Sequence, residues 1–254
     1  RAPGRFESTF VRERLMDSLA VKLGIDRIEL RRRNLITSDQ MPFSLNFDEP
    51  GVEDMEIDNG DYPQLLDKAL NWLKWDEMEA DLECRRAAGE MVGSGIGVFV
   101  EESGKGPSDG ARISVDENGA IEILTGGASL GQGFETTMAQ ICANTLGVDY
   151  QRITVIHGQT NLIPYGIGAH AARATVMTGS AVNVTALTLR TKALDLAAEM
   201  LQLPADSLDI VDGTVIVADK PSGPSITLAE IARRNEEGLA AEDFHKTKES
   251  AFPY

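Results

Sequence analysis

The sequence predicts an α+β fold, because helical and strand-like segments follow one another without the regular βαβ order of a doubly wound sheet. The 254 residues are 42% hydrophobic and 25% charged, a composition typical of soluble globular proteins, and they suffice for one large or two modest domains. No run of about 18 apolar residues occurs, so no membrane-spanning helix and no membrane partner are expected.

Helices are expected first along the chain. Apolar residues at a spacing of four predict an amphipathic helix over 8–23, and these residues are Val11, Leu15, Leu19 and Leu23. Asp26 and Glu29 have the spacing of a capping box, which predicts a second, short helix over 25–34.

A long surface loop is expected over 37–61, where Pro, Gly, Asn and acidic residues occur without periodicity. Tyr62 and Pro63 open a further helix, since proline is tolerated in the first turn. Charge is uneven in this region, because residues 39–90 hold fifteen Asp/Glu against four Lys/Arg, a net charge of −11. This acidic segment is interpreted as a solvated surface.

Strand-like segments begin near residue 92. The apolar, glycine-rich residues 92–100 predict a strand. Residues 112–115 and 120–124 predict a hairpin, because the Asp-Glu-Asn-Gly sequence between them is typical of a turn. A helix is expected over 134–146, followed by a short buried strand over 153–156.

The longest helix is expected over about 175–201, and its predicted apolar face consists of Val184, Leu187, Leu194, Ala198 and Leu201. Asp212 and Gly213 then predict a type I′ hairpin between two short strands. Thr227 is expected to cap a last helix over 228–234.

Charge and metal-ligand counts exclude several functions. The net charge of −16 argues against a broad basic face for nucleic acid, so no nucleic-acid partner is expected. Two cysteines and three histidines lie far apart, without a CxxC or HExxH pattern. No metal site made of protein side chains is therefore expected. If the chain takes part in redox chemistry, its electron carrier must be held mainly by non-metal contacts or by another polypeptide.

The glycine cluster 126–133 is the first candidate site. It has four glycines in eight residues between a predicted strand and a predicted helix, so backbone N–H groups could approach an anion or a pterin ring edge. Gln132 adds an amide that donates and accepts. No Gly-Lys-Ser/Thr sequence follows, so the cluster is not a Walker A phosphate-binding loop. It also lacks a complete dinucleotide-binding GxGxxG motif, because Thr136 stands where the third glycine would be. A tight turn for strand–helix packing is the alternative.

Residues 165–182 form the second candidate site, because this segment is rich in Gly, Ala and Ser and leads into the longest helix. Arg173 is its strong charge-assisted donor, and His170 is the histidine nearest in sequence to either cluster. Close helix packing is the alternative interpretation. Residues 104–107 predict only a turn, since acidic neighbours such as Asp109 would repel a phosphate.

Five motifs in one order resemble the large, molybdenum-binding subunit of the xanthine dehydrogenase and aldehyde oxidase family, the molybdenum hydroxylases. They are residues 1–7, residues 24–35, residues 99–107, residues 131–136 and residues 166–182. The third resembles "YVEGTGxGP" and the fourth "GQGHET". The resemblance covers nearly the whole chain and implies part of the family's molybdenum-cofactor-binding domains.

The resemblance also implies an activity. Such subunits oxidise a small-molecule substrate, usually an aldehyde or N-heterocycle, with oxygen taken from water. Molybdenum arrives on a pyranopterin, either molybdopterin or its cytosine dinucleotide. Partner subunits carry a 2Fe-2S centre and FAD, and the complex is expected to be an oligomer in the cytoplasm.

Site residues follow from the same resemblance. Gly131, Gln132 and Gly133 are expected to contact the pyranopterin, and a second segment, Ala171, Ala172, Arg173 and Ala174, to line it through backbone groups. Arg1 matches an arginine on the substrate side of the molybdenum, and Glu101 falls near the substrate funnel. Ala172 and Ala174 stand where family members often have serine, so backbone N–H groups would replace two hydroxyl donors.

The family's catalytic glutamate lies in a "GVGE"-like motif, which does not occur here. Residues 1–92 are therefore interpreted as the end of a first molybdenum-binding domain, with the acidic segment, and residues 93–254 as the first half of a second. The chain would be an internal fragment, inactive in isolation. A free-standing, non-catalytic ligand-binding or assembly module of the same fold is the alternative, and a nucleotide-binding enzyme is a third hypothesis.

Overall fold

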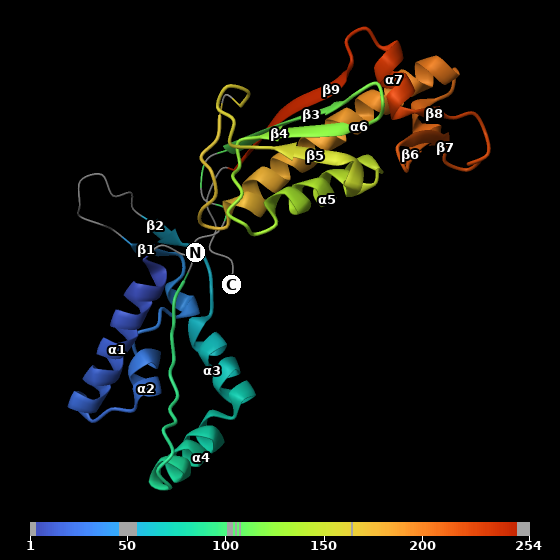
Figure 1. Ribbon diagram of the computed structural model, residues 1–254. Helices are drawn as coiled ribbons and strands as arrows, with labels where there is room; N and C mark the ends of the chain where they lie inside the picture. The colour runs from blue at the N-terminus through green and yellow to red at the C-terminus, as the bar shows by residue number, and fades with distance from the viewer. Residues whose placement is uncertain are drawn as a thin grey trace. The chain divides into compact units, whose positions relative to one another are not determined.

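The computed structural model describes residues 4–45, 55–100, 104, 106, 108–163 and 165–247. Its contacts divide the chain into two compact units, with the boundary between Glu101 and Glu102 (Figure 1). Helices and antiparallel sheets are both present, so the predicted α+β class is confirmed.

The first unit is mainly helical. Its helices are α1 (Arg5–Leu23), α2 (Arg27–Arg32), α3 (Tyr62–Leu73) and α4 (Trp75–Ala87). Asp26 caps α2, because its carboxylate accepts hydrogen bonds from the N–H groups of Ile28 and Glu29 at 2.8 and 2.9 Å. Pro63 lies in the first turn of α3, as predicted.

A pair of short strands and one helix of this unit were not expected. The predicted loop 37–61 contains a short antiparallel pair, β1 (Phe43–Leu45) and β2 (Met55–Ile57), next to residues that the structure does not describe. Helix α4 follows α3 directly, although its apolar periodicity is weak. Helix α4 was not predicted because it is rich in charged residues and has no clear apolar stripe.

The predicted strand over 92–100 is wrong. This segment has no regular secondary structure (Figure 1), because its backbone groups bond to helix side chains rather than to a neighbouring strand. The Val98 carbonyl accepts from Arg12 Nη2 at 2.6 Å, and the Val98 N–H donates to Glu13 at 3.2 Å. The 92–100 segment is thus an irregular stretch that is hydrogen-bonded to side chains of α1 and α2.

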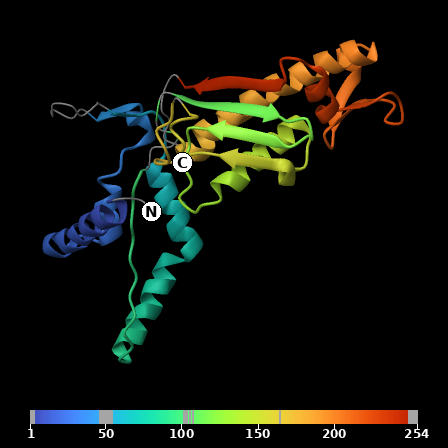
Figure 2. The ribbon, with the colours of Figure 1, turned by 45° about the horizontal axis from the view of Figure 1, so that its top comes forward.

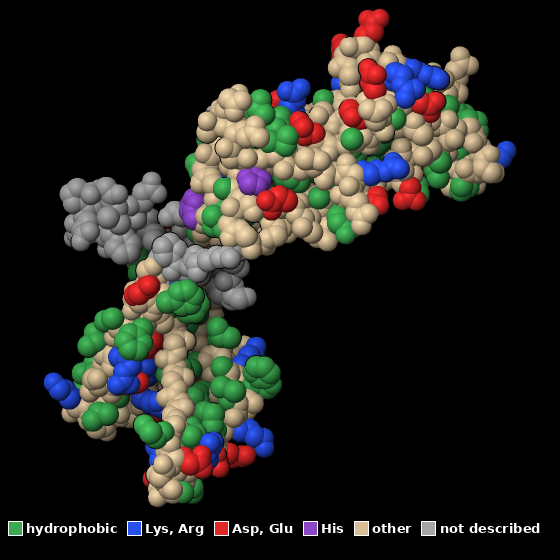
Figure 3. All heavy atoms as spheres, viewed as in Figure 1, with side chains coloured by type: hydrophobic (Ala, Val, Ile, Leu, Met, Phe, Trp, Pro, Cys, Tyr) green, Lys and Arg blue, Asp and Glu red, His purple; other side chains and the backbone are tan. Residues whose placement is uncertain are grey.

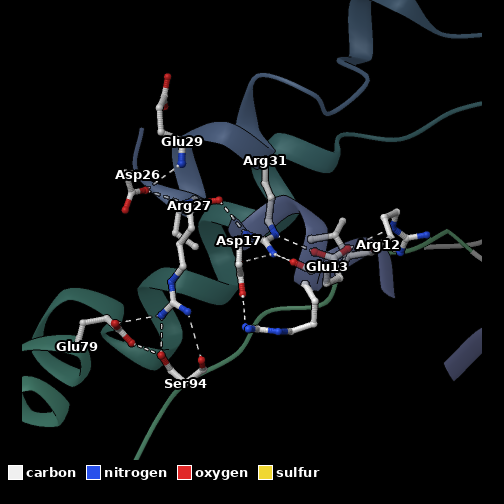
Figure 4. A network of polar contacts seen from close by, with 12 residues as sticks. Arg12, Glu13, Asp17, Asp26, Arg27, Glu29, Arg31, Glu79 and Ser94 are labelled. Atoms are coloured by element: carbon white, nitrogen blue, oxygen red, sulfur yellow. Dashed lines mark hydrogen bonds and ion pairs between the residues drawn. The ribbon is translucent and has the colours of Figure 1, made fainter. Parts of the chain in front are cut away.

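A polar network connects these helices to the 92–100 segment (Figure 4). Arg31 of α2 has a side chain only 3% exposed, and its guanidinium pairs with Glu13 at 2.8 Å and Asp17 at 2.9 Å. Arg27 pairs with Glu79 of α4 at 3.0 Å and donates to the Ser94 carbonyl at 3.2 Å. Charged residues therefore fill the positions between these helices.

The predicted apolar face of α1 does not face the core of this unit. Val11, Leu15, Leu19 and Leu23 are 43–65% exposed, whereas Glu13 and Ala20 are the buried positions. Figure 3 shows hydrophobic side chains on the surface of this unit among charged ones. The periodicity predicted the helix correctly but not the side that packs.

The second unit is built on a four-stranded sheet of order β5-β4-β3-β9. The strands are β3 (Ser108–Val115), β4 (Ile121–Thr125), β5 (Ile153–Ile156) and β9 (Leu239–Lys246). The predicted β3–β4 hairpin is confirmed, and β5 pairs parallel to β4 but is only half-buried. Strand β9 was not predicted and pairs antiparallel with the full length of β3.

Helices α5 (Phe134–Leu146) and α6 (Gly179–Leu201) cover one face of this sheet (Figure 2). Met138, Leu146 and Leu189 pack with Ile113 and Ile123 in the core. The predicted face of the longest helix is partly wrong, because Leu187 is 49% exposed. Small residues are buried instead, among them Ala181, Ala186, Ala193 and Ala197, which lets α6 approach the sheet closely.

A smaller sheet and a last helix complete the unit. The sheet has the order β6 (Leu208–Val211), β7 (Thr214–Val217) and β8 (Ile226–Thr227). Asp212 and Gly213 have φ of 48° and 75°, which confirms the predicted type I′ turn. Thr227 caps α7 (Leu228–Arg234), as predicted, and the structure adds that Thr227 forms a capping box with Glu230.

Candidate functional site

The glycine cluster joins the end of β4 to the start of α5. Gly131 and Gly133 adopt φ of 75° and 76°, a left-handed conformation that glycine adopts without steric cost. Gly131, Gln132 and Gly133 are all exposed. No side chain caps α5 at Gly133, and the first N–H groups of a helix have no partner within the helix, although the Glu135 N–H bonds to its own carboxylate.

The second candidate segment meets this cluster in space. A methyl group placed on Gly126 would lie 2.2 Å from the Tyr165 carbonyl oxygen, and one on Gly166 would lie 2.4 Å from the Gly126 carbonyl oxygen. The two backbones thus touch, and only glycine permits this approach at either position. Figure 1 shows both loops and the starts of α5 and α6 at the same end of the sheet.

A tight turn exposes the predicted backbone groups of the second segment. The Arg173 N–H donates to the His170 carbonyl at 2.9 Å, while Ala171 and Ala172 have φ of 42° and 53°. Two positive φ values make this a type I′ turn, which costs alanine about 1–2 kcal/mol per residue. Ala172 is exposed, whereas Ala171 and Ala174 are half-buried.

A π-helical turn, η3 (Ala174–Thr178), connects this turn to α6. The sequence predicts an uninterrupted helix here, so the π turn is a correction to the expected start of the longest helix. Such turns are rare and frequently occur at functional sites. The strained turn and the π turn together mark this end of the sheet as a candidate ligand site.

The Arg173 side chain does not serve as an exposed donor, contrary to the sequence-based hypothesis. It is fully buried, and its Nη1 lies 3.1 Å from Asp109 Oδ2. Asp109, expected to repel phosphate from the 104–107 turn, is also fully buried and is compensated by this guanidinium. Gly104 from that turn donates to the Ala171 carbonyl at 2.9 Å, so it supports the second segment.

Sequence reasoning also missed His157. Its Nε2 lies 3.0 Å from Glu135 Oε1 in the first turn of α5, and the Ser129 hydroxyl donates to Glu135 Oε2 at 3.0 Å. The His157 ring packs edge-on against Phe134. His170 was the nearest histidine in sequence, but His157 is the one that reaches the glycine cluster, through the loop that follows β5.

We expect Glu135 to titrate at low pH. Its own backbone N–H, the His157 ring and the Ser129 hydroxyl hold the pKa of Glu135 below its ordinary value of 4.5. The stabilisation from the carboxylate is therefore complete above pH 4.5 and is lost as the pH falls through the lowered pKa. Carboxyl NMR of wild type and of Ser129→Ala would measure this, with the midpoint rising in the variant. A wild-type midpoint at or above 4.5 would contradict it.

Two predicted residues lie outside the described part of the chain. These are Arg1 and Glu101, the expected substrate-side residues. Within the described residues, no three His, Cys, Asp or Glu side chains cluster closely enough to hold a metal ion. The described helices also include none long and apolar enough to cross a membrane.

The donor set fits a molybdenum-bearing pterin. Backbone N–H groups of the exposed residues Gly131–Gly133 suit phosphate or pterin acceptors, and the nearby Glu135 carboxylate is engaged by His157 and Ser129. Gly126 and Gly166 place no side chain at the point where the two loops touch. A flat, polar-edged ligand could therefore lie against backbone on both segments.

Comparisons with known proteins show the family to which the chain belongs. Two family models described as molybdopterin cofactor-binding domain match residues 67–254 and residues 1–35. The 6-hydroxypseudooxynicotine dehydrogenase complex subunit gamma of Paenarthrobacter nicotinovorans is 36% identical over 268 residues, which covers 100% of this chain and 33% of that protein. The carbon monoxide dehydrogenase large chain of Hydrogenophaga pseudoflava is 33% identical, over 80% of this chain and 26% of that protein.

Solved structures show the same relationship. Quinoline 2-oxidoreductase from Pseudomonas putida 86 matches with a TM-score of 0.70 and 28% identity, over 95% of this chain and 33% of that one. CO dehydrogenase from Oligotropha carboxidovorans matches with a TM-score of 0.69 over 97% and 33%. The chain thus spans about a third of the length of these relatives.

Proposed function

Since the chain belongs to the molybdopterin-binding large subunits of the molybdenum hydroxylases, we propose that its second unit holds the pyranopterin between residues 126–133 and 165–174. The observation that carries this proposal is the backbone contact between Gly126 and Gly166, which brings both loops to the start of α5. Gly131, Gln132 and Gly133 would hold one edge of the cofactor. Ala171, Ala172 and Ala174 would hold another through backbone groups, with Arg173 in support.

The cofactor, when bound, supplies two-electron oxidation of a substrate carbon. The chain's own contribution is to bind and orient the cofactor, because N–H groups at the start of α5 would donate to its anionic acceptors. The proposed substrate class is an aldehyde or N-heterocycle, with oxygen from water. Arg1 and Glu101 are proposed on the substrate side.

We also propose that the chain works within a larger assembly. Relatives are named as the gamma subunit of a complex and as a large chain, which supports the presence of partner subunits. In this proposal the partner subunits carry 2Fe-2S and FAD, and the complex is a cytoplasmic oligomer. Residues 1–92 would end a first molybdenum-binding domain and residues 93–254 begin a second. The matches to residues 1–35 and 67–254 by two family models support the order of two such domains, but the second match begins at residue 67, ahead of the proposed boundary.

The test is metal and pterin content. The polypeptide is purified with whatever sequence natively flanks residues 1–254, and molybdenum is measured by mass spectrometry beside pterin fluorescence after oxidation. We expect about one molybdenum and one pterin per chain. A folded protein with neither would contradict the proposal. The 254-residue chain alone should show no molybdenum-dependent turnover, since it lacks the "GVGE"-like motif.

A further inference from the structure

A buried polar network links the 165–174 segment to β3 and to the start of α6. The side chains of Asp109, Arg173 and Thr178 are each 0% exposed. One carboxylate oxygen of Asp109, Oδ2, lies 3.1 Å from Arg173 Nη1 and accepts a hydrogen bond from the Thr178 hydroxyl at 2.5 Å. Two parts of the chain, β3 and the residues that lead into α6, therefore converge on one atom although they are 64 to 69 residues apart in sequence.

The buried Arg173 guanidinium donates hydrogen bonds to backbone carbonyls next to the strained turn. Its Nη1 also donates to the Gly168 carbonyl at 2.8 Å, and its Nη2 donates to the Ser108 carbonyl at 3.0 Å. Gly168 precedes the type I′ turn, and the Arg173 backbone ends it. The side chain thus fixes the residues before the turn against the first residue of β3.

Stability alone is a poor explanation for this network. Burying an ion pair costs desolvation free energy that the mutual attraction often only offsets, so apolar residues would serve folding as well. The positive φ values at Ala171 and Ala172 also require surroundings that impose them. A rigid, buried, fork-shaped cation that reaches several acceptors meets this requirement, and lysine does not.

We propose that Asp109, Arg173 and Thr178 are positioning residues for the cofactor. They do not contact it; they hold the backbone of residues 170–174 and the π turn in the conformation that binds it. This inference rests on the proposed function. In it, the backbone groups of residues 170–174 recognise the cofactor, and the buried Arg173 side chain does not contact the cofactor.

The experiment compares matched threonine variants and an arginine variant. Arg173→Lys keeps the charge but loses the fork, Thr178→Val removes the hydroxyl, and Thr178→Ser retains it. Thr185→Val is the control, because Thr185 is also 0% exposed on α6 but donates only to the Ala111 and Ala181 carbonyls, outside the network. All are made in the natively flanked polypeptide, and molybdenum content and thermal unfolding of the cofactor-free protein are measured.

We expect molybdenum content to fall about tenfold in Arg173→Lys and severalfold in Thr178→Val, and to be retained in Thr178→Ser. Thr185→Val should also lower the unfolding temperature, because it removes a buried hydrogen-bonded hydroxyl, while keeping its molybdenum. The inference is overturned if the wild type is loaded and Arg173→Lys and Thr178→Val are equally loaded. It is also overturned if molybdenum loss follows unfolding temperature across all variants, Thr185→Val included. A wild type without molybdenum overturns the proposed function as well.

Discussion

Replacing Gly126 with alanine should reduce bound molybdopterin roughly 10- to 100-fold. The new methyl group would lie 2.2 Å from the Tyr165 carbonyl oxygen and 2.5 Å from Gly166 Cα, and both are backbone atoms that cannot rotate away. The loops must separate, at a cost on the order of 1–3 kcal/mol. Since about 1.4 kcal/mol is tenfold in an equilibrium constant, binding that needs both loops weakens accordingly.

Gly93→Ala is the matched control for this experiment. A methyl group at Gly93 would meet nothing within 4 Å, and the residue has no left-handed φ. Molybdenum and pterin per chain should remain at the wild-type level in Gly93→Ala and fall in Gly126→Ala. Equal loading of the two variants would show that the contact between residues 126 and 166 does not shape the site.

Replacing Arg31 with methionine should destabilise the first unit by about 3 kcal/mol, the lower end of the cost of breaking a buried ion pair. The lower end applies because Glu13 keeps two other partners, Arg12 at 3.3 Å and the Val98 N–H at 3.2 Å (Figure 4). Asp17 keeps Arg14 at 3.5 Å. Amide hydrogen exchange in α1 and α2, measured by mass spectrometry, reports the free energy of opening of this unit separately from the second.

Arg33→Met provides the comparison. Arg33 pairs with Glu29 at 2.7 Å, but its side chain is 60% exposed, so water screens the pair and its loss should cost less than about 1 kcal/mol. Equal exchange rates in Arg31→Met and Arg33→Met would refute a structural role for the network. Faster exchange in α1 and α2 of Arg31→Met alone is the expected result.

Local signals predicted the elements that they specify directly. Helix 134–146, the turn at Asp212 and Gly213, and the Thr227 capping box agree with the structure because each depends on residues within one turn of each other. Strand β9 was missed because its partner β3 lies more than a hundred residues earlier. The 92–100 segment looks like a strand, but Arg12 and Glu13 take the hydrogen bonds that a neighbouring strand would take.

Composition, motif order and local φ requirements are enough to predict the fold class, the family resemblance and the two glycine- and alanine-rich segments of the candidate site. How these segments meet depends on tertiary contacts. Gly126 touches Gly166, His157 reaches Glu135, and Asp109 neutralises Arg173 from 64 residues away. Long-range contacts of this kind arise from the packing of α5 and α6 on the sheet, and no periodicity or spacing along the chain encodes them.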